Sequence, residues 1–366
     1  MREAQTFPNN IRATVSKRLL VSVGAFALLL GGCASFTADG GLSTAREIAA
    51  TELNKDIVKI TSEAEALSAQ GRIEELLRRP LTPDAAVQIA LLKNRGLQAA
   101  FNDLGVAEAA YVQATLPPSP RIALGRITGP LDLELERQII VGLFELATLP
   151  ARAAIAEQRF RAAQFRNAEA VLRLGLETRR QYYRTVAANQ QVGFLQQALA
   201  AAESASILAR QLGETGSLNK LEQAREQAFF QELGAQLARA RIEQRAQRER
   251  LIRHLGLFGR DIDFRLPGTL PPLPARLASG RDIESRALAR RVDLQVLRNE
   301  LNAVAGQFGL SGATRFVSDV ELVGMSSWER GKSFQIENGR VEVDREVTRR
   351  RGLEVDALVG GEPPLP

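Results

Sequence analysis

Residues 90–104 read ALLKNRGLQAAFNDL, and residues 287–301, which lie 197 positions later, read ALARRVDLQVLRNEL. Six of the fifteen positions are identical. The charge is also kept where Lys93 corresponds to Arg290 and where Asp103 corresponds to Glu300. Two unrelated helices of this composition would not agree so closely. The spacing therefore predicts an internally duplicated chain.

The first copy lies in a predicted helix over residues 82–114. Thr82 is a good N-cap residue, and Pro83 fits the first helical position. Apolar residues then recur at helical spacing as far as Leu104. The helix must end before the sequence LPPSP at residues 116–120, because no helix can continue across these prolines.

After the prolines, the apolar residues no longer recur at helical spacing. Residues 131–136 read LDLELE, and this strict alternation predicts a strand with one apolar face. With the extended stretch that begins at Ile122 and the turn Thr128-Gly129-Pro130, it predicts a β-hairpin. The carboxylates of this strand suit a wet inner surface opposite a lipid-facing one; an ordinary solvated strand face is the alternative. In the second copy, residues 315–322 and 340–356 predict two further strands.

Long helices are predicted between the two copies. Pro150 begins a segment without a further proline or turn cluster until Gly213, so we expect a helix over residues 151–212, roughly 93 Å long at 1.5 Å per residue. A second helix is expected over residues 218–255, roughly 57 Å long. Laid end to end, this helix and that of residues 82–114 match the long one. Helices of such length indicate coiled-coil or bundle packing.

The offset divides the chain into segments. The first repeat covers residues 81–260, a proline-rich linker covers 261–280, and an incomplete second repeat of helix and hairpin covers 281–356. A complete second copy would extend to about residue 453 (256 + 197), beyond the 366 residues of this sequence. The tail at residues 357–366 holds Gly360-Gly361 and cannot begin a long helix. We therefore expect a C-terminally truncated chain that lacks the second long helical pair.

The N-terminus carries an export signal. Arg12, Lys17 and Arg18 precede an apolar run of about 12 residues, shorter than the roughly 20 needed to cross a bilayer as a helix. A signal-anchor helix that stays in the membrane is the alternative reading. The run ends in a stretch that resembles the bacterial lipobox, which is formed by Leu30, Gly31, Gly32 and Cys33. We predict a signal peptide over residues 1–32, lipidation of Cys33, and a lipid-anchored N-terminal tether over 33–80. Ala34 and Ser35 after the cysteine favour the outer membrane.

Composition excludes several functions. The chain has a net charge of +6, of which the leader contributes +3, so no nucleic-acid partner is predicted. Cys33 is the only cysteine and His254 the only histidine, and Met325 is the only methionine outside the leader. These residues predict neither a metal site nor a cofactor. The chain carries no phosphate-binding loop or nucleophile elbow, and we expect that it is not an enzyme.

Four stretches carry a family resemblance: LTPDAAVQIAL at residues 81–91, LPPSP at 116–120, LIRHLGL at 251–257 and RVDLQ at 291–295. Behind a lipobox, and in a duplicated helix–hairpin–helix unit, they resemble the TolC family of outer-membrane efflux channels. The segment over residues 136–152 is most similar to the lipoprotein branch of that family linked to heavy-metal efflux.

The resemblance implies a mainly α fold with a small β component. Long helices would form a coiled-coil barrel, and β-hairpins would contribute to a shared transmembrane β-barrel. The residues expected in the barrel strands are Ile122, Leu124, Leu131, Leu133, Leu135, Phe316, Val320 and Leu322.

The resemblance also implies a homotrimer that joins a periplasmic adaptor and an inner-membrane pump of the RND type. The helical hairpin tip expected to contact the adaptor comprises Gly213, Glu214, Thr215, Gly216, Ser217 and Leu218. The implied function is export of small solutes, with heavy-metal ions or drugs as candidates. A truncated nonfunctional remnant of such a channel and a periplasmic scaffold or adaptor lipoprotein are the alternatives.

Overall fold

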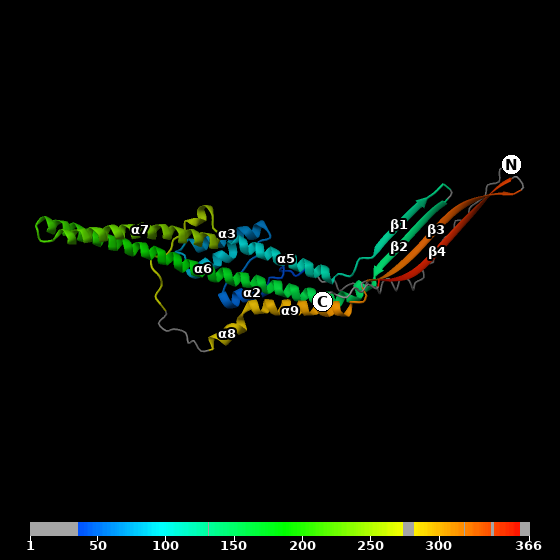
Figure 1. Ribbon diagram of the computed structural model, residues 1–366, viewed down its shortest axis with the longest axis horizontal. Helices are drawn as coiled ribbons and strands as arrows, with labels where there is room; N and C mark the ends of the chain where they lie inside the picture. Colours follow the sequence, from blue (N-terminus) through cyan, green and yellow to red (C-terminus); the bar gives the residue numbers. More distant parts are fainter. Residues whose placement is uncertain (1–35, 131, 274–281, 318, 338–339, 359–366) are drawn as a thin grey trace. The chain divides into compact units, whose positions relative to one another are not determined.

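The computed structural model describes residues 36–130, 132–273, 282–317, 319–337 and 340–358 (Figure 1). The chain divides into two compact units. The helical unit comprises Thr37–Tyr111 and Ala154–Phe308, and the sheet unit comprises the described parts of Val112–Ala153 and Gly309–Pro366. Helices predominate beside one small sheet, which confirms the prediction of a mainly α fold with a small β component.

The segment before residue 81 is part of the helical core. It forms α2 (Ser43–Ile48), a π-helical turn η1 (Ala49–Leu53) and α3 (Glu63–Leu77). Leu42 and Phe101 are both almost fully buried in one core cluster, although they lie far apart in the sequence. Apolar burial of this kind stabilises the segment against the rest of the helical unit.

The helix predicted over residues 82–114 is divided into α4 (Pro83–Lys93) and α5 (Arg95–Thr115). The predicted start is confirmed, because the Thr82 side chain accepts a hydrogen bond from the Ala85 N–H at 3.1 Å. Asn94 separates the two helices in an extended conformation. Its Oδ1 accepts a hydrogen bond from the Leu97 N–H at 3.1 Å, so Asn94 caps the second helix.

The long helix α6 (Leu143–Glu214) begins before the predicted position, and Pro150 lies inside it. The prediction that Pro150 starts the helix was therefore wrong. A proline in a helix interior removes one backbone hydrogen bond, at a cost of about 3 kcal/mol, yet β2 (Asp132–Gly142) leads into the helix without a loop. The Thr148 hydroxyl donates to the Phe144 carbonyl at 2.9 Å in the first turns of this helix.

Helix α7 (Lys220–Leu255) runs back alongside α6 in the helical unit (Figure 1). Apolar side chains of the two helices form one buried cluster, which includes Val192, Leu195, Ala202, Leu233 and Leu237. At its other end, α7 stops at Gly256, which adopts a left-handed conformation with φ of +69°. Such a glycine is a common helix terminator.

The second copy contains α8 (Ile283–Arg290) and α9 (Val292–Ala313), after a short 3₁₀ turn η2 (Gly259–Ile262). The two helices are separated at Arg291, which lies 197 residues after Asn94 (291 − 94). Within the helical unit, α9 lies beside α6, where Arg166 and Glu300 form an ion pair.

Four antiparallel strands form the sheet in the order β1-β2-β3-β4. The strands are β1 (Arg121–Thr128), β2, β3 (Asp319–Glu337) and β4 (Arg340–Leu358). Both predicted hairpins are present. The third strand begins later than expected, so Phe316 lies in a turn before β3 and is not a strand residue. In the described part of the chain, no helix has the length and apolar character needed to cross a membrane.

Candidate functional site

The two faces of the sheet differ sharply in charge. Residues that pair directly across antiparallel strands share one face of the sheet, and the residues of one strand alternate between the faces. The register pairs Trp328 with both Leu135 and Arg349, and it pairs Glu329 with Glu134. The basic face contains Arg126, Arg137, Arg330, Lys332, Arg345, Arg349 and Arg351. The acidic face contains Asp132, Glu134, Glu136, Asp319, Glu321, Glu329, Asp344, Glu346, Glu354 and Asp356, beside the two arginines Arg121 and Arg350.

The predicted strand residues lie on one face. Ile122, Leu124, Leu133, Leu135, Val320 and Leu322 share the basic face with its cations, whereas Asp132, Glu134 and Glu136 lie on the acidic face. Leu131 lies outside the described residues. The alternation in residues 131–136 thus separates apolar from acidic side chains in the register of the sheet.

Exposed apolar side chains occupy one end of the basic face. Ile122 is 68% exposed and Leu353 is 75% exposed, and both lie in the cross-strand row that contains Ile139 and Gly324. The next row toward the helices adds Val141, Leu322 and Val355. Contiguous exposed apolar surface of this kind marks a protein or membrane contact.

The tip of the α6–α7 hairpin is a closely bonded turn. The Leu212 carbonyl accepts from the Ser217 N–H at 2.8 Å, from the Leu218 N–H at 3.2 Å and from the Thr215 hydroxyl at 2.9 Å. Gly216 has φ of +73°, a conformation that favours glycine. Asn219 then caps α7 by accepting a hydrogen bond from the Glu222 N–H at 2.9 Å. The turn therefore presents a fixed backbone.

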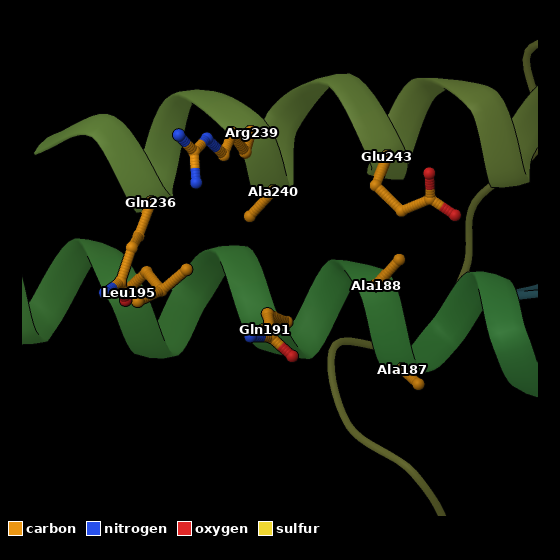
Figure 2. Close-up of a pocket in the computed structure, with 8 residues that line it drawn as sticks. All are labelled: Ala187, Ala188, Gln191, Leu195, Gln236, Arg239, Ala240 and Glu243. Atoms are coloured by element: carbon orange, nitrogen blue, oxygen red, sulfur yellow. The ribbon is translucent and has the colours of Figure 1, made fainter. Parts of the chain in front are cut away.

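A groove between α6 and α7 lies farther along this hairpin (Figure 2). Ala188, Gln191 and Leu195 line it from α6, and Arg239 and Glu243 line it from α7. Figure 2 shows these side chains spread along the two helices rather than gathered around one point. The residues that line this groove include neither a nucleophile beside a base nor a cluster of metal ligands.

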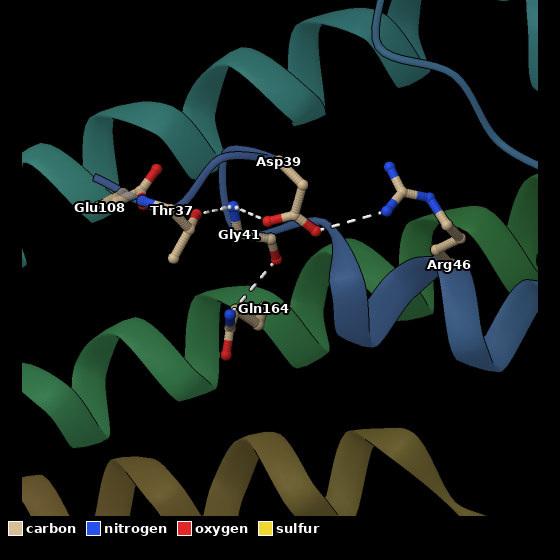
Figure 3. Close-up of polar contacts among 6 residues, drawn as sticks. All are labelled: Thr37, Asp39, Gly41, Arg46, Glu108 and Gln164. Carbon is tan, nitrogen blue, oxygen red and sulfur yellow. Dashed lines mark hydrogen bonds and ion pairs between the residues drawn. The ribbon is translucent and has the colours of Figure 1, made fainter. Parts of the chain in front are cut away.

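The chain just after the predicted lipid-bearing cysteine is attached to α5 through Glu108 (Figure 3). Glu108 is 3% exposed, and its carboxylate accepts from the Thr37 N–H at 2.5 Å and from the Thr37 hydroxyl at 2.6 Å. The same hydroxyl accepts from the Gly41 N–H at 2.6 Å. Charge-assisted hydrogen bonds of this kind are among the stronger polar contacts in proteins.

Further contacts hold the same turn. Gly41 has φ of +75°, and a side chain there would collide with the Phe160 ring. The Gln164 amide of α6 donates to the Gly41 carbonyl at 3.3 Å, and Asp39 forms an ion pair with Arg46 at 3.5 Å (Figure 3). Cys33 and the lipobox residues Leu30, Gly31 and Gly32 lie outside the described residues.

Two further residues, His254 and Trp328, contact neighbouring groups of the chain. The His254 backbone carbonyl accepts a hydrogen bond from the Asn94 side chain at 3.0 Å, at the end of α7. Trp328 lies in β3, where the Arg330 guanidinium is 5.1 Å from the centre of its ring. No group of three or more potential metal ligands occurs in the described part of the chain.

The cations of β4 were missed by sequence reasoning. Arg345, Arg349 and Arg351 are spaced by even numbers of residues, and such spacing in a strand places them on one face. This even spacing is the signal that the sequence offers for a basic face. The Thr37–Glu108 contact had no comparable signal, because 71 residues separate its partners.

Several solved structures that are similar to this chain in fold are channel proteins. No family model and no curated protein matches the sequence. The chain is similar to CusC, whose crystal structures describe the conformational changes of folding and transmembrane channel formation. The TM-score is 0.58, and the identity is 16% over 76% of this chain and 66% of that one. The outer-membrane channel OprN has a TM-score of 0.57 and 17% identity over 88% of this chain and 71% of that one. The MtrE outer-membrane channel of Neisseria gonorrhoeae has a TM-score of 0.56 and 18% identity over 75% of this chain and 63% of that one.

This chain therefore has the fold of the outer-membrane channels of the TolC type, and the predicted resemblance is confirmed at the level of the fold. It spans about two thirds of the length of the CusC chain. CusC matches the chain about as well as OprN and MtrE do, so the assignment to the heavy-metal branch stays a prediction.

Proposed function

We propose that the chain is a subunit of an outer-membrane efflux channel, which assembles as a homotrimer and exports small solutes. An adaptor in the periplasm and an inner-membrane pump of the RND type would complete the system. Heavy-metal ions or drugs are the candidate substrates. The similarity of the fold to outer-membrane channels is the observation that carries this proposal.

The sheet supports a role in the membrane. Four strands from each of three protomers would suffice for a closed barrel, in which one face of every strand contacts lipid and the other lines water. The exposed apolar rows that include Ile122 and Leu353 suit lipid, and the carboxylates of the acidic face suit an aqueous lumen. Closure would also pair the free edges of β1 and β4.

The helical hairpin supports docking to an adaptor. The tip formed by residues 213–218 is held by hydrogen bonds to the Leu212 carbonyl, so its shape does not depend on a partner. A preformed tip loses little conformational entropy on binding. The exposed side chain of Leu221, just past the tip, would add apolar contact area.

A lipid on Cys33 would be positioned by the Thr37–Glu108 contact. Thr37 lies four positions after Cys33, and a fully extended chain of four steps reaches at most about 14 Å. The buried Glu108 carboxylate would thereby limit how far the acylated cysteine can lie from α5.

The test compares two lysine substitutions at adjacent positions of β1. Ile122 and Ala123 are both exposed and lie on opposite faces of the sheet. Lysine on a lipid-facing strand position costs about 2–4 kcal/mol near the bilayer midplane, but little on a wet face. We expect the unmodified chain and Ala123→Lys to appear in outer-membrane fractions as detergent-resistant trimers that conduct ions in planar bilayers. Ile122→Lys should reduce the yield of such trimers.

Equal yields for the two variants would contradict the assignment of the faces. A monomer that leaves the membrane once the lipid is removed, and that gives no conductance, would reject the channel and favour the periplasmic scaffold. Substitution of Cys33 by serine separates the contributions, because it removes the lipid and leaves the strands unchanged.

A further inference from the structure

The basic face of the sheet carries seven cations and no carboxylate among the described residues that the register places on it. None of the seven forms an ion pair in the described part of the chain. Lys332 and Arg345 are direct cross-strand neighbours, whereas Arg126 and Arg349 lie at the two ends of one row, with Leu135 and Trp328 between them. Like charges opposite one another destabilise a sheet. The face therefore favours an external anion that offsets this repulsion.

The cations follow the apolar rows along the same face. The row of Ile122 and Leu353 is succeeded by the row of Arg137 and Arg351, and then by the row of Arg126 and Arg349. Successive rows are about 6.8 Å apart along the strands. From the row of Arg351 to that of Arg345, the cations occupy three such intervals, or roughly 20 Å.

Trp328 lies in the middle of this band. It pairs with Arg349 and Leu135, and the Arg330 guanidinium lies against its ring. Tryptophan favours the boundary between hydrocarbon and lipid headgroups, where one part of the ring is in an apolar environment and the N–H can be hydrated. The order along the face is thus apolar side chains, then an aromatic ring among arginines, which matches the order of acyl chains and headgroups in a bilayer.

We propose that the basic face binds the phosphate groups of anionic lipids at the surface of the membrane. The inference rests on the proposed function, because it places the apolar rows in the hydrocarbon. Six of the seven cations are arginines, whose planar guanidinium groups bind phosphate oxygens in pairs. A nucleic acid would meet the same arginines, but it would leave the adjoining row of Ile122 and Leu353 exposed to water.

The test uses Trp328 as its reporter, because it is the only tryptophan of the chain. The full chain is reconstituted in vesicles that contain phosphatidylcholine and phosphatidylglycerol, and bromine quenchers are placed on the acyl chains of one lipid or of the other. One arginine near an anionic surface changes the local lipid concentration by about fivefold. The two kinds of vesicle contain equal mole fractions of brominated lipid. We expect brominated phosphatidylglycerol to quench Trp328 as strongly as if its concentration around this residue were about fivefold or more above its average in the bilayer.

The variants separate the two faces. The double variant Arg349→Gln and Arg351→Gln should lower the enrichment factor of phosphatidylglycerol to nearly one, because both side chains lie on the basic face. Arg350→Gln with Arg121→Gln removes the same charge from the opposite face and should leave the enrichment unchanged. Arg126→Gln, on a different strand, provides a second variant should the double variant of β4 fail to fold.

Each contrary outcome is distinct. Equal quenching by the two brominated lipids would overturn the lipid preference and leave the channel proposal intact. Quenching by aqueous acrylamide but by neither lipid would place the sheet outside the bilayer and overturn both proposals. A change in Trp328 fluorescence on addition of heparin, together with equal quenching by the two brominated lipids, would assign the face to a soluble polyanion and overturn the inference.

Discussion

Replacement of Gly256 by alanine should destabilise the helical unit. Gly256 ends α7 with φ of +69°, at the point where this helix abuts the break between α4 and α5. A Cβ atom there would lie 2.8 Å from the Lys93 carbonyl oxygen and 3.0 Å from the Asn94 Cα. These neighbours are backbone atoms, so the collision cannot be relieved by rotation of a side chain.

The magnitude follows from two contributions. A residue other than glycine in the left-handed region costs about 1–2 kcal/mol. Forcing an additional carbon into packed surroundings costs typically about 1–3 kcal/mol. We therefore expect Gly256→Ala to lower the free energy of unfolding by about 2–5 kcal/mol.

Gly259 provides the matched control. It has φ of +66°, close to that of Gly256, but an added Cβ would meet no atom within 4 Å. Gly259→Ala should thus cost only the conformational part, about 1–2 kcal/mol. The measurement is urea unfolding of the full chain in detergent, followed by helical circular dichroism. Equal midpoints for the two variants would refute the close packing of α7 against the helix break.

Three further predictions concern the same unit. Phe101→Ala, in the buried core, should lower the free energy of unfolding by about 3–5 kcal/mol, whereas Phe36→Ala, at a position 60% exposed, should change it by less than about 0.5 kcal/mol. Thr37→Val removes the hydroxyl that donates to the buried Glu108 carboxylate and accepts from the Gly41 N–H, so proteolysis near residue 40 should become faster. A hydrogen bond from Arg72 lowers the pKa of Asp56 below its ordinary 3.8. The resulting stabilisation is present above 3.8 and is lost as the pH falls through the lower folded pKa, so Asp56→Asn should flatten the acid side of a plot of unfolding midpoint against pH.

Features with local causes could be predicted from the sequence. The helix start at Thr82 depends on a cap and a proline next to each other, and both act within one helical turn. The first hairpin follows from the alternation in residues 131–136 and a turn at Gly129, which local geometry also determines. The long helix follows from an uninterrupted run without turn residues between positions 151 and 212.

Features with distant causes could not be predicted. The break at Asn94 lies within a helical apolar pattern, and its partners are the His254 carbonyl and Gly256, about 160 residues away. The segment before residue 81 shows no strong helical periodicity, yet tertiary packing buries Leu42 and Leu53 almost completely. Pro150 was interpreted by its usual preference for helix starts, and the tertiary context overrides that preference.

The helix breaks at Asn94 and Arg291 have the same backbone conformation, and a comparison of the two shows what causes it. Asn94 has φ of −66° and ψ of 117°, and Arg291 has φ of −67° and ψ of 113°. Their side chains act differently: Asn94 caps the following helix, whereas Arg291 forms an ion pair with Asp293 at 2.5 Å. Two different side chains at the same spacing as the sequence repeat thus accompany one backbone conformation. The conformation therefore cannot be a consequence of either side chain alone, and we interpret it as a requirement of the helix–break–helix unit, for which Asn94 supplies one local solution and Arg291 another.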